Sequence, residues 1–126
     1  QIGMRGLAND MEATRNARTL GTRIITAEAI RRKGLEWTMA QIPKSEAIYV
    51  TLDVDVMDPS VTPGTGTYEP GGLRFEELDE LLTSIPSKGR IVGFDVVEVN
   101  PLRDPSGRTG QTAARLILDL LGAIFH

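Results

Sequence analysis

The stretch "AIYVTLDVDV", residues 47–56, is the strongest strand pattern in the sequence. It is rich in β-branched and aromatic residues and almost continuously apolar, which is typical of a strand that is buried on both faces of a sheet. We therefore expect a central strand here. Asp53 and Asp55 interrupt the apolar run near its end. In a strand they would share one face, with Cβ atoms about 6.6 Å apart, because each residue rises about 3.3 Å.

Two neighbouring buried carboxylates call for a compensating charge. Repulsion raises one pKa until a proton binds, whereas a divalent cation compensates both charges at once. Oxygen donors suit magnesium, manganese or calcium, while zinc normally takes imidazole or thiolate ligands. We interpret Asp53 and Asp55 as ligands of one ion, or as flanking two. The alternative is that one aspartate caps the following loop while the other is solvated.

Two other cation or phosphate motifs can be compared with this spacing. An EF-hand loop requires an acidic or amide residue at position five, glycine at six and glutamate at twelve. Met57, Asp58 and Gly64 occupy those positions, so this class is excluded. A phosphotransferase with an aspartyl nucleophile also places D-x-D at the end of an apolar strand, with Asp53 as the nucleophile. It remains the alternative, although "GFDVVE", residues 93–98, matches its later acidic motif poorly.

Strand and helix patterns alternate along the whole chain. This order predicts βαβ units, hence an α/β fold with a parallel sheet and helices on both faces. A helix is expected from the cap Asn9 to Leu20, and another after the cap Thr26 with a break at Gly34. Two more are expected later in the chain, the last with Thr109 or Thr112 as its cap. The segments that carry these patterns are residues 1–5 and 22–25 as strands, 75–85 as a helix, 90–99 as a buried strand and 109–125 as a core helix.

Composition restricts the class of protein. The 126 residues are 40% hydrophobic and 25% charged, which fits a single globular domain over residues 1–126. The net charge of -3 and the lack of a basic stripe exclude a nucleic-acid partner. The absence of cysteine fits a reducing compartment, and we expect the cytoplasm. The longest apolar stretch contains Asp119 and falls short of the roughly 20 residues that cross a membrane.

The segment "DPSVTPGTGTYEPGG", residues 58–72, is long for a connection between strand and helix. Such connections usually have about 2–6 residues, and longer ordered loops are often functional. Pro59, Pro63 and Pro70 restrict the backbone, while the glycines allow it to approach a ligand. Sites in open parallel sheets form beyond the carboxyl ends of the strands. We therefore expect an ordered functional loop beside Asp53 and Asp55.

Several segments together resemble the ureohydrolases, the family of arginase, agmatinase and guanidinobutyrase. They are "QIGMRG" (1–6), "TLDVDVMDPSVTPGTGTYEPGGL" (51–73), "GFDVVEVNP" (93–101) and "TAARLI" (112–117). The resemblance implies a three-layer α/β/α fold with a mainly parallel sheet, of which this chain is the C-terminal part. It also implies two manganese ions, trimers or hexamers, and hydrolysis of a small cationic guanidino compound to urea and an amine.

The resemblance also implies roles for particular residues. By this resemblance, Asp53 and Asp55 would be manganese ligands, and Glu98 would hold the substrate guanidinium as the catalytic residue of this part. Asp95 would contact the metal ligands without binding the metal itself. A carboxylate can pair bidentately with the planar guanidinium, and paired metals lower the pKa of a bridging water. The alternatives are a surface ion pair for Glu98 and ordinary capping for Asp95.

The chain departs from the family pattern in several places. The Gly-Gly-Asp-His and Asp-Ala-His-x-Asp motifs that carry the other metal ligands are absent, and the only histidine is His126. Tyr68 stands where proline is usual. The loop "TPGTGT", residues 62–67, resembles the agmatinase and guanidinobutyrase branch. We expect part of a longer enzyme that is inactive alone. The non-enzymatic alternative is a truncated binding module.

Overall fold

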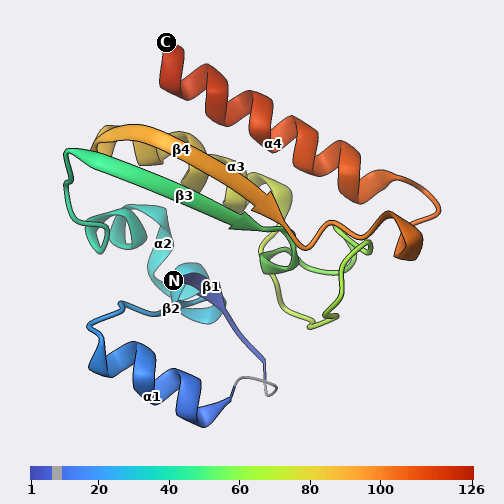
Figure 1. Ribbon diagram of the computed structural model, residues 1–126, viewed down its shortest axis with the longest axis horizontal. Coiled ribbons are helices and arrows are strands. Elements are labelled where there is room, and N and C mark those ends of the chain that lie inside the picture. The colour runs from blue at the N-terminus through green and yellow to red at the C-terminus, as the bar shows by residue number, and fades with distance from the viewer. Residues whose placement is uncertain (7–9) are drawn as a thin grey trace.

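The computed structural model describes residues 1–6 and 10–126. Strands and helices alternate along the chain, as the sequence predicts (Figure 1). The strands are β1 (Ile2–Met4), β2 (Ile25–Thr26), β3 (Ala47–Asp53) and β4 (Arg90–Val97), and the helices are α1 (Met11–Thr19), α2 (Ala27–Ala40), α3 (Phe75–Ser84) and α4 (Arg108–Phe125).

The strands form two parallel pairs. β1 pairs with β2, and β3 pairs with β4. The register of the second pair sets Thr51 opposite Asp95 and Asp53 opposite Val97, with an irregularity after Ile48. The predicted α/β class with parallel strands is therefore confirmed. Because the two strands run in the same direction, the residues that follow them meet at one edge of the sheet.

The two faces of β3 have different surroundings. Val50 and Leu52 are buried and belong to the hydrophobic core, whereas Tyr49 is 60% exposed and Thr51 is exposed. The expectation of a strand buried on both faces is therefore not met within the described residues. The ring of Tyr49 lies beside Gly93, where an added Cβ would come within 2.8 Å of the ring. Glycine at this position thus allows the ring to lie across β4.

The core lies between the packed face of β3 and the helices. Leu78, Leu82 and Leu116 are at most 4% exposed and join Val50 and Leu52 in one cluster. The helical spacing predicted for residues 75–85 is confirmed by the burial of α3. The prediction of a core helix near the end of the chain is only partly correct, because α4 buries one side and exposes Leu118 and Phe125 on others.

Helix ends follow local capping rules. Thr26 caps α2 by accepting a hydrogen bond from the Ala29 backbone N–H at 3.1 Å, as predicted, and Gly34 breaks that helix with a φ of 82°. Asp10 caps α1 through the Glu12 N–H; the predicted cap Asn9 lies outside the described residues. Within residues 1–6 and 10–126, no helix combines the length and apolarity needed to cross a membrane.

The packing of α4 generates a stability prediction. Leu116 is 0% exposed, and Leu118 on the same helix is 65% exposed. Leu116→Ala should lower the free energy of unfolding by about 2–5 kcal/mol, because it removes buried methyl groups and leaves a cavity. Leu118→Ala should change it by less than about 0.5 kcal/mol. Urea denaturation of both variants measures this difference, and equal effects would contradict the core described here.

Candidate metal and substrate site

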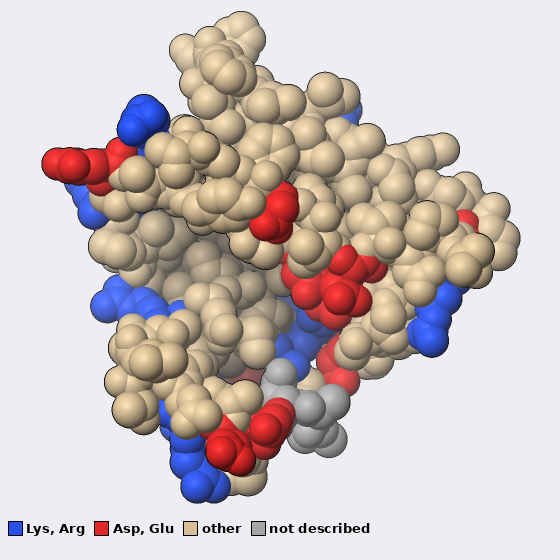
Figure 2. Space-filling model, viewed as in Figure 1, with Lys and Arg blue, Asp and Glu red and all other residues tan. Residues whose placement is uncertain are grey.

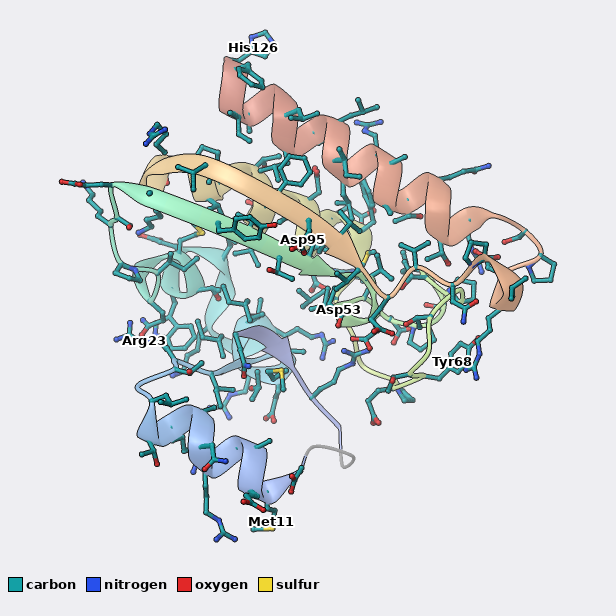
Figure 3. The ribbon with its side chains drawn as sticks, in the orientation of Figure 1. Met11, Arg23, Asp53, Tyr68, Asp95 and His126 are labelled. Carbon is teal, nitrogen blue, oxygen red and sulfur yellow. The ribbon has the colours of Figure 1, made fainter. Side chains whose placement is uncertain are left out.

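Acidic side chains gather beyond the carboxyl ends of β3 and β4, next to a hollow in the surface (Figure 2). Asp53 is the last residue of β3, and Glu98 comes directly after β4. Asp55 lies in the 3₁₀ turn Val54–Val56. Figure 3 shows Asp53 where β3 ends. Parallel pairing thus brings residues 45 positions apart in the sequence to one place.

The local geometry of the two aspartates differs from the sequence prediction. They do not alternate along one strand, because β3 ends at Asp53 and the chain turns. The turn forms because the Asp53 carboxylate accepts a hydrogen bond from the Asp55 backbone N–H at 3.0 Å, a local contact that competes with strand pairing. The prediction that both lie in a strand is wrong, but the turn still keeps their carboxyl groups together.

Three neighbouring residues, Asp53, Arg5 and Glu98, affect the pKa of Asp55. Burial raises the pKa of Asp55, and the charge of Asp53 together with a hydrogen bond between the two carboxyl groups raises it further. The positive charge of Arg5 opposes this rise, while the charge of Glu98 adds to it. Glu98 is therefore near enough to act on the same carboxyl group. The pKa of Asp55 is therefore raised in spite of the positive charge of Arg5.

Arg5 connects the end of β1 to this site. Its guanidinium donates hydrogen bonds to the backbone carbonyl oxygens of Asp55 at 2.7 Å, Met57 at 3.1 Å and Glu69 at 2.7 Å. A planar guanidinium can hold several acceptors in fixed geometry. Arg5 thus ties the turn after β3 to the loop of residues 58–72. Sequence analysis missed it, because its partners lie at least 50 positions away.

Glu98 has an unusual backbone conformation. Its φ is 65°, and it is the only non-glycine residue with positive φ in the described part of the chain. Such conformations cost free energy and are concentrated at functional sites. Its carboxylate lies against Gly66, where an added Cβ would come within 3.1 Å of Oε2. The turn after β4 therefore directs an exposed carboxylate toward the loop.

The loop of residues 58–72 is held by specific hydrogen bonds, as expected for an ordered loop. Thr62 Oγ1 donates to the Val54 carbonyl at 3.0 Å inside the protein. The Gly64 N–H donates to Thr109 Oγ1 at 2.7 Å, and the Gly64 carbonyl accepts from the Asn100 N–H at 2.7 Å. The loop is therefore fastened to the turn after β3, to the segment after β4 and to α4.

Asp104 secures the α4 side of this arrangement. Its carboxylate accepts hydrogen bonds from the Ser106 hydroxyl and from the Thr109 backbone N–H at 2.6 Å. These bonds, that of Ser106 first, lower the pKa of Asp104 to about 2. The predicted cap Thr109 does not cap α4, which starts after Gly107; instead it is buried and bonds to Gly64.

Tyr68 packs at the outer side of the loop. The guanidinium of Arg103 lies over its ring, 5.7 Å from the centroid, which is within the range of a cation–π contact. Arg103 also donates a hydrogen bond to the Gly66 carbonyl at 3.0 Å. Tyr68, where the family pattern has proline, therefore contributes to holding Gly66 next to Glu98 through Arg103.

Asp95 lies on the exposed face of β4 (Figure 3). Its Oδ2 accepts a hydrogen bond from the Tyr49 hydroxyl at 3.0 Å, which is the main reason that the pKa of Tyr49 is raised. Its Oδ1 is buried and has no hydrogen-bond partner among residues 1–6 and 10–126. These contacts do not cap a helix or a loop. A supporting role for Asp95 near the ligands stays a prediction.

Two neighbouring carboxylates are the residues at this edge of the sheet that could hold a metal. The paired carboxylates of Asp53 and Asp55 fit a hard divalent cation, because such an ion would compensate the charge that raises the Asp55 pKa. Within the described ranges, no group of three or more His, Cys, Asp or Glu residues could hold an ion. His126 lies at the end of α4, far from Asp53 (Figure 3).

Comparison with known proteins reveals clear relatives. The family model described as the arginase family matches residues 1–122. Proclavaminate amidinohydrolase of Streptomyces clavuligerus is 39% identical over 96% of this chain and 39% of its own length. The mitochondrial guanidino acid hydrolase of Homo sapiens is 35% identical over 98% of this chain and 36% of its own length. The crystal structure of formimidoylglutamase from Bacillus subtilis superposes with a TM-score of 0.91 at 32% identity, covering 98% of this chain and 40% of that one. The chain thus spans about two fifths of the length of these relatives.

The raised pKa of Asp55 leads to a prediction for the metal-free chain. Folding disfavours its ionised form, so the chain should gain stability as the pH falls from neutral through this raised pKa toward the ordinary value of about 3.9. Asp55→Asn should remove this pH dependence and raise the melting temperature at pH 7.

Asp58 provides a control of opposite sign. Hydrogen bonds from Ser60 and Gly71 lower its pKa, so its charged form is stabilised by folding. Asp58→Asn should lower the melting temperature at pH 7. Scanning calorimetry in a chelating buffer measures both variants, and a lower melting temperature for Asp55→Asn would contradict the described electrostatics.

Proposed function

Because this chain belongs to the arginase family, we propose that it supplies part of the active site of a manganese-dependent enzyme that hydrolyses a guanidino compound to urea and an amine. In this proposal residues 1–126 are the C-terminal part of one catalytic domain. The observation that carries the proposal is the meeting of Asp53, Asp55 and Glu98 at the carboxyl ends of β3 and β4. The family match favours this function over the phosphotransferase and the truncated binding module.

The donor set suits the chemistry. Asp53 and Asp55 would hold the two manganese ions together with ligands from outside this chain. When bound, the ions would supply a water of lowered pKa, which is the nucleophile that a resonance-stabilised guanidinium requires at neutral pH. The acidic character of the site favours both the ions and a cationic substrate.

Glu98 is the residue proposed to hold the substrate. Its carboxylate is exposed, lies near Asp55 and is directed toward Gly66. Two carboxylate oxygens match two N–H groups of a guanidinium, which fixes the plane of the substrate. Gly66 has no side chain, so the space beside the carboxylate stays open for the substrate. Asp95 is proposed to support this edge of the sheet through its bond to Tyr49.

We place the substrate in the agmatine or guanidinobutyrate class. The form of the 62–67 loop supports this class, and one relative is named for the hydrolysis of guanidino acids. We further propose that the enzyme works as a trimer or hexamer in the cytoplasm. The family resemblance supports the assembly, and the cysteine-free composition supports the compartment.

The isolated chain should bind manganese weakly and release no urea, because the described residues supply only two ligands. A chimera in which residues 1–126 replace the matched region of the Streptomyces clavuligerus enzyme should bind manganese tightly and release urea from agmatine or guanidinobutyrate. Calorimetry with manganese and a urea assay measure both properties. Efficient turnover by the isolated chain would contradict the proposal.

Within that chimera, Glu98→Gln should raise KM for the guanidino substrate by roughly 10- to 100-fold, because it removes a charged hydrogen-bond acceptor worth about 1.5–3 kcal/mol. Manganese affinity should change little. Glu76→Gln, in the first turn of α3, is the control and should leave KM unchanged. If both variants had the same KM as the parent chimera, Glu98 would not be the guanidinium site.

A further inference from the structure

A positively charged side chain of this chain lies near the proposed guanidinium site. Arg103 ends the 3₁₀ turn Pro101–Arg103 after β4, and its Nη1 donates a hydrogen bond to the Gly66 carbonyl oxygen at 3.0 Å. Glu98 Oε2 lies 3.1 Å from the position that a Cβ on Gly66 would take. The Cβ position and the carbonyl oxygen of one residue are within about 4 Å of each other, so Glu98 Oε2 and Arg103 Nη1 are at most about 10 Å apart. A short ligand can therefore contact both groups.

Most of the hydrogen-bonding capacity of Arg103 is open to such a ligand. A guanidinium has five N–H donors. Within residues 1–6 and 10–126, the one hydrogen bond of this side chain is the bond to Gly66. No Asp or Glu in that part of the chain forms a salt bridge with it. Arg103 is exposed, so a solute can reach the remaining donors.

The ring of Tyr68 restricts the orientation of this guanidinium. Tyr68 belongs to the loop of residues 58–72 and lies beyond the end of β3 (Figure 3). The Arg103 guanidinium lies over the ring, 5.7 Å from its centroid. A guanidinium on an aromatic face keeps its N–H edges available for a planar partner. Because the family pattern has proline in place of Tyr68, this aromatic support is a feature of the present chain.

We propose that Arg103 binds a carboxylate at the far end of the substrate, so that the enzyme selects an ω-guanidino acid such as 4-guanidinobutyrate over agmatine. The inference rests on the proposed function, because it takes Glu98 as the guanidinium site. Each end of the substrate then meets a planar group of opposite charge. Both contacts can be bidentate, since a guanidinium and a carboxylate match each other in geometry.

The length of 4-guanidinobutyrate suits the two groups. Three methylene groups separate its guanidino nitrogen from its carboxylate, and the extended molecule spans about 8 Å. A charged hydrogen bond adds about 2.8 Å at each end. The molecule therefore reaches Glu98 and Arg103 even at the upper limit of their separation.

The charge of Arg103 distinguishes two substrates that share the guanidinium. The negative charges of Asp53, Asp55 and Glu98 by themselves favour a substrate with two positive ends, such as agmatine. Arg103 has the opposite effect, because it repels the ammonium group of agmatine and attracts a carboxylate. Selection for the acid thus arises from an unfavourable contact with one substrate and a favourable contact with the other.

Steady-state kinetics of the chimera test this selection. Urea release is measured with 4-guanidinobutyrate and with agmatine. Arg103→Gln should lower kcat/KM for 4-guanidinobutyrate by roughly 10- to 100-fold, because it removes a charged hydrogen-bond donor. It should leave kcat/KM for agmatine unchanged or raise it. An equal loss for both substrates would show that Arg103 only holds the loop, and would overturn the inference.

Arg108→Gln is the matched control. It removes the same charge from an exposed residue at the start of α4. Because solvent and salt screen exposed charges, the ratio of the two kcat/KM values should stay within about twofold of the parent ratio. If Arg108→Gln changed this ratio as much as Arg103→Gln, the selection would come from net charge and the inference would be overturned.

Equilibrium binding tests the inference if the chimera hydrolyses neither compound. Calorimetry with manganese present compares 4-guanidinobutyrate with butylguanidine, which has the same guanidinium and no carboxylate. Arg103→Gln should raise Kd at least roughly 10-fold for the acid and leave it within about twofold for butylguanidine. This result upholds the carboxylate site even though the proposed hydrolysis fails. Equal effects on the two ligands, or no binding of the acid by the parent chimera, would overturn it.

Discussion

The repulsion between the carboxylates of Asp53 and Asp55 is the constraint on which the interpretation of this molecule depends. The fold holds these groups together rather than letting them separate: Asp53 accepts the Asp55 N–H and turns the chain, and Arg5 fixes the Asp55 carbonyl from β1. The positive charge of Arg5 offsets this repulsion only in part, because burial, Asp53 and Glu98 all raise the pKa of Asp55. A structure that maintains such a cluster against its own electrostatics has a cation as its natural counterpart.

The residues that surround Asp53 and Asp55 follow the ends of the parallel strands β3 and β4. The parallel pairing of β3 with β4 places Glu98 beside the aspartates, and the left-handed conformation of Glu98 turns its carboxylate toward Gly66. The loop that carries Gly66 is fixed by buried bonds to Val54 and Thr109. Hydrogen bonds to the turn after β3 and to α4 therefore fix the loop on one side of the cluster.

Patterns of short range could be predicted from the sequence, and contacts of long range could not. The strand patterns of β3 and β4, the helical spacing of α3 and the break at Gly34 are local, and the structure confirms them. The predicted burial of β3 and of β4 is wrong for the described residues, because Tyr49 on β3 and Val92 on β4 are exposed. The position of Asp53 at a strand end follows from the same run. The strand assignment of Asp55 fails because one side-chain bond outweighs strand alternation. Arg5 carries no local signature, because its bonds to the carbonyls of Asp55, Met57 and Glu69 join positions at least 50 residues apart. The bonds of Asp104 to Ser106 and Thr109 are local, whereas the bond of Thr109 to Gly64 joins positions 45 residues apart.

The most direct measurement of the central claim is paramagnetic broadening of backbone amide signals during a manganese titration of the 126-residue chain. The ion should broaden the amides of residues 53–57 and 98 first, because the bound ion would lie between the carboxylates at the ends of β3 and β4. Broadening should require a higher manganese concentration in Asp53→Asn. Signals that broaden first on the acidic side of α3, or at no particular place, would show that these two aspartates are not a metal site.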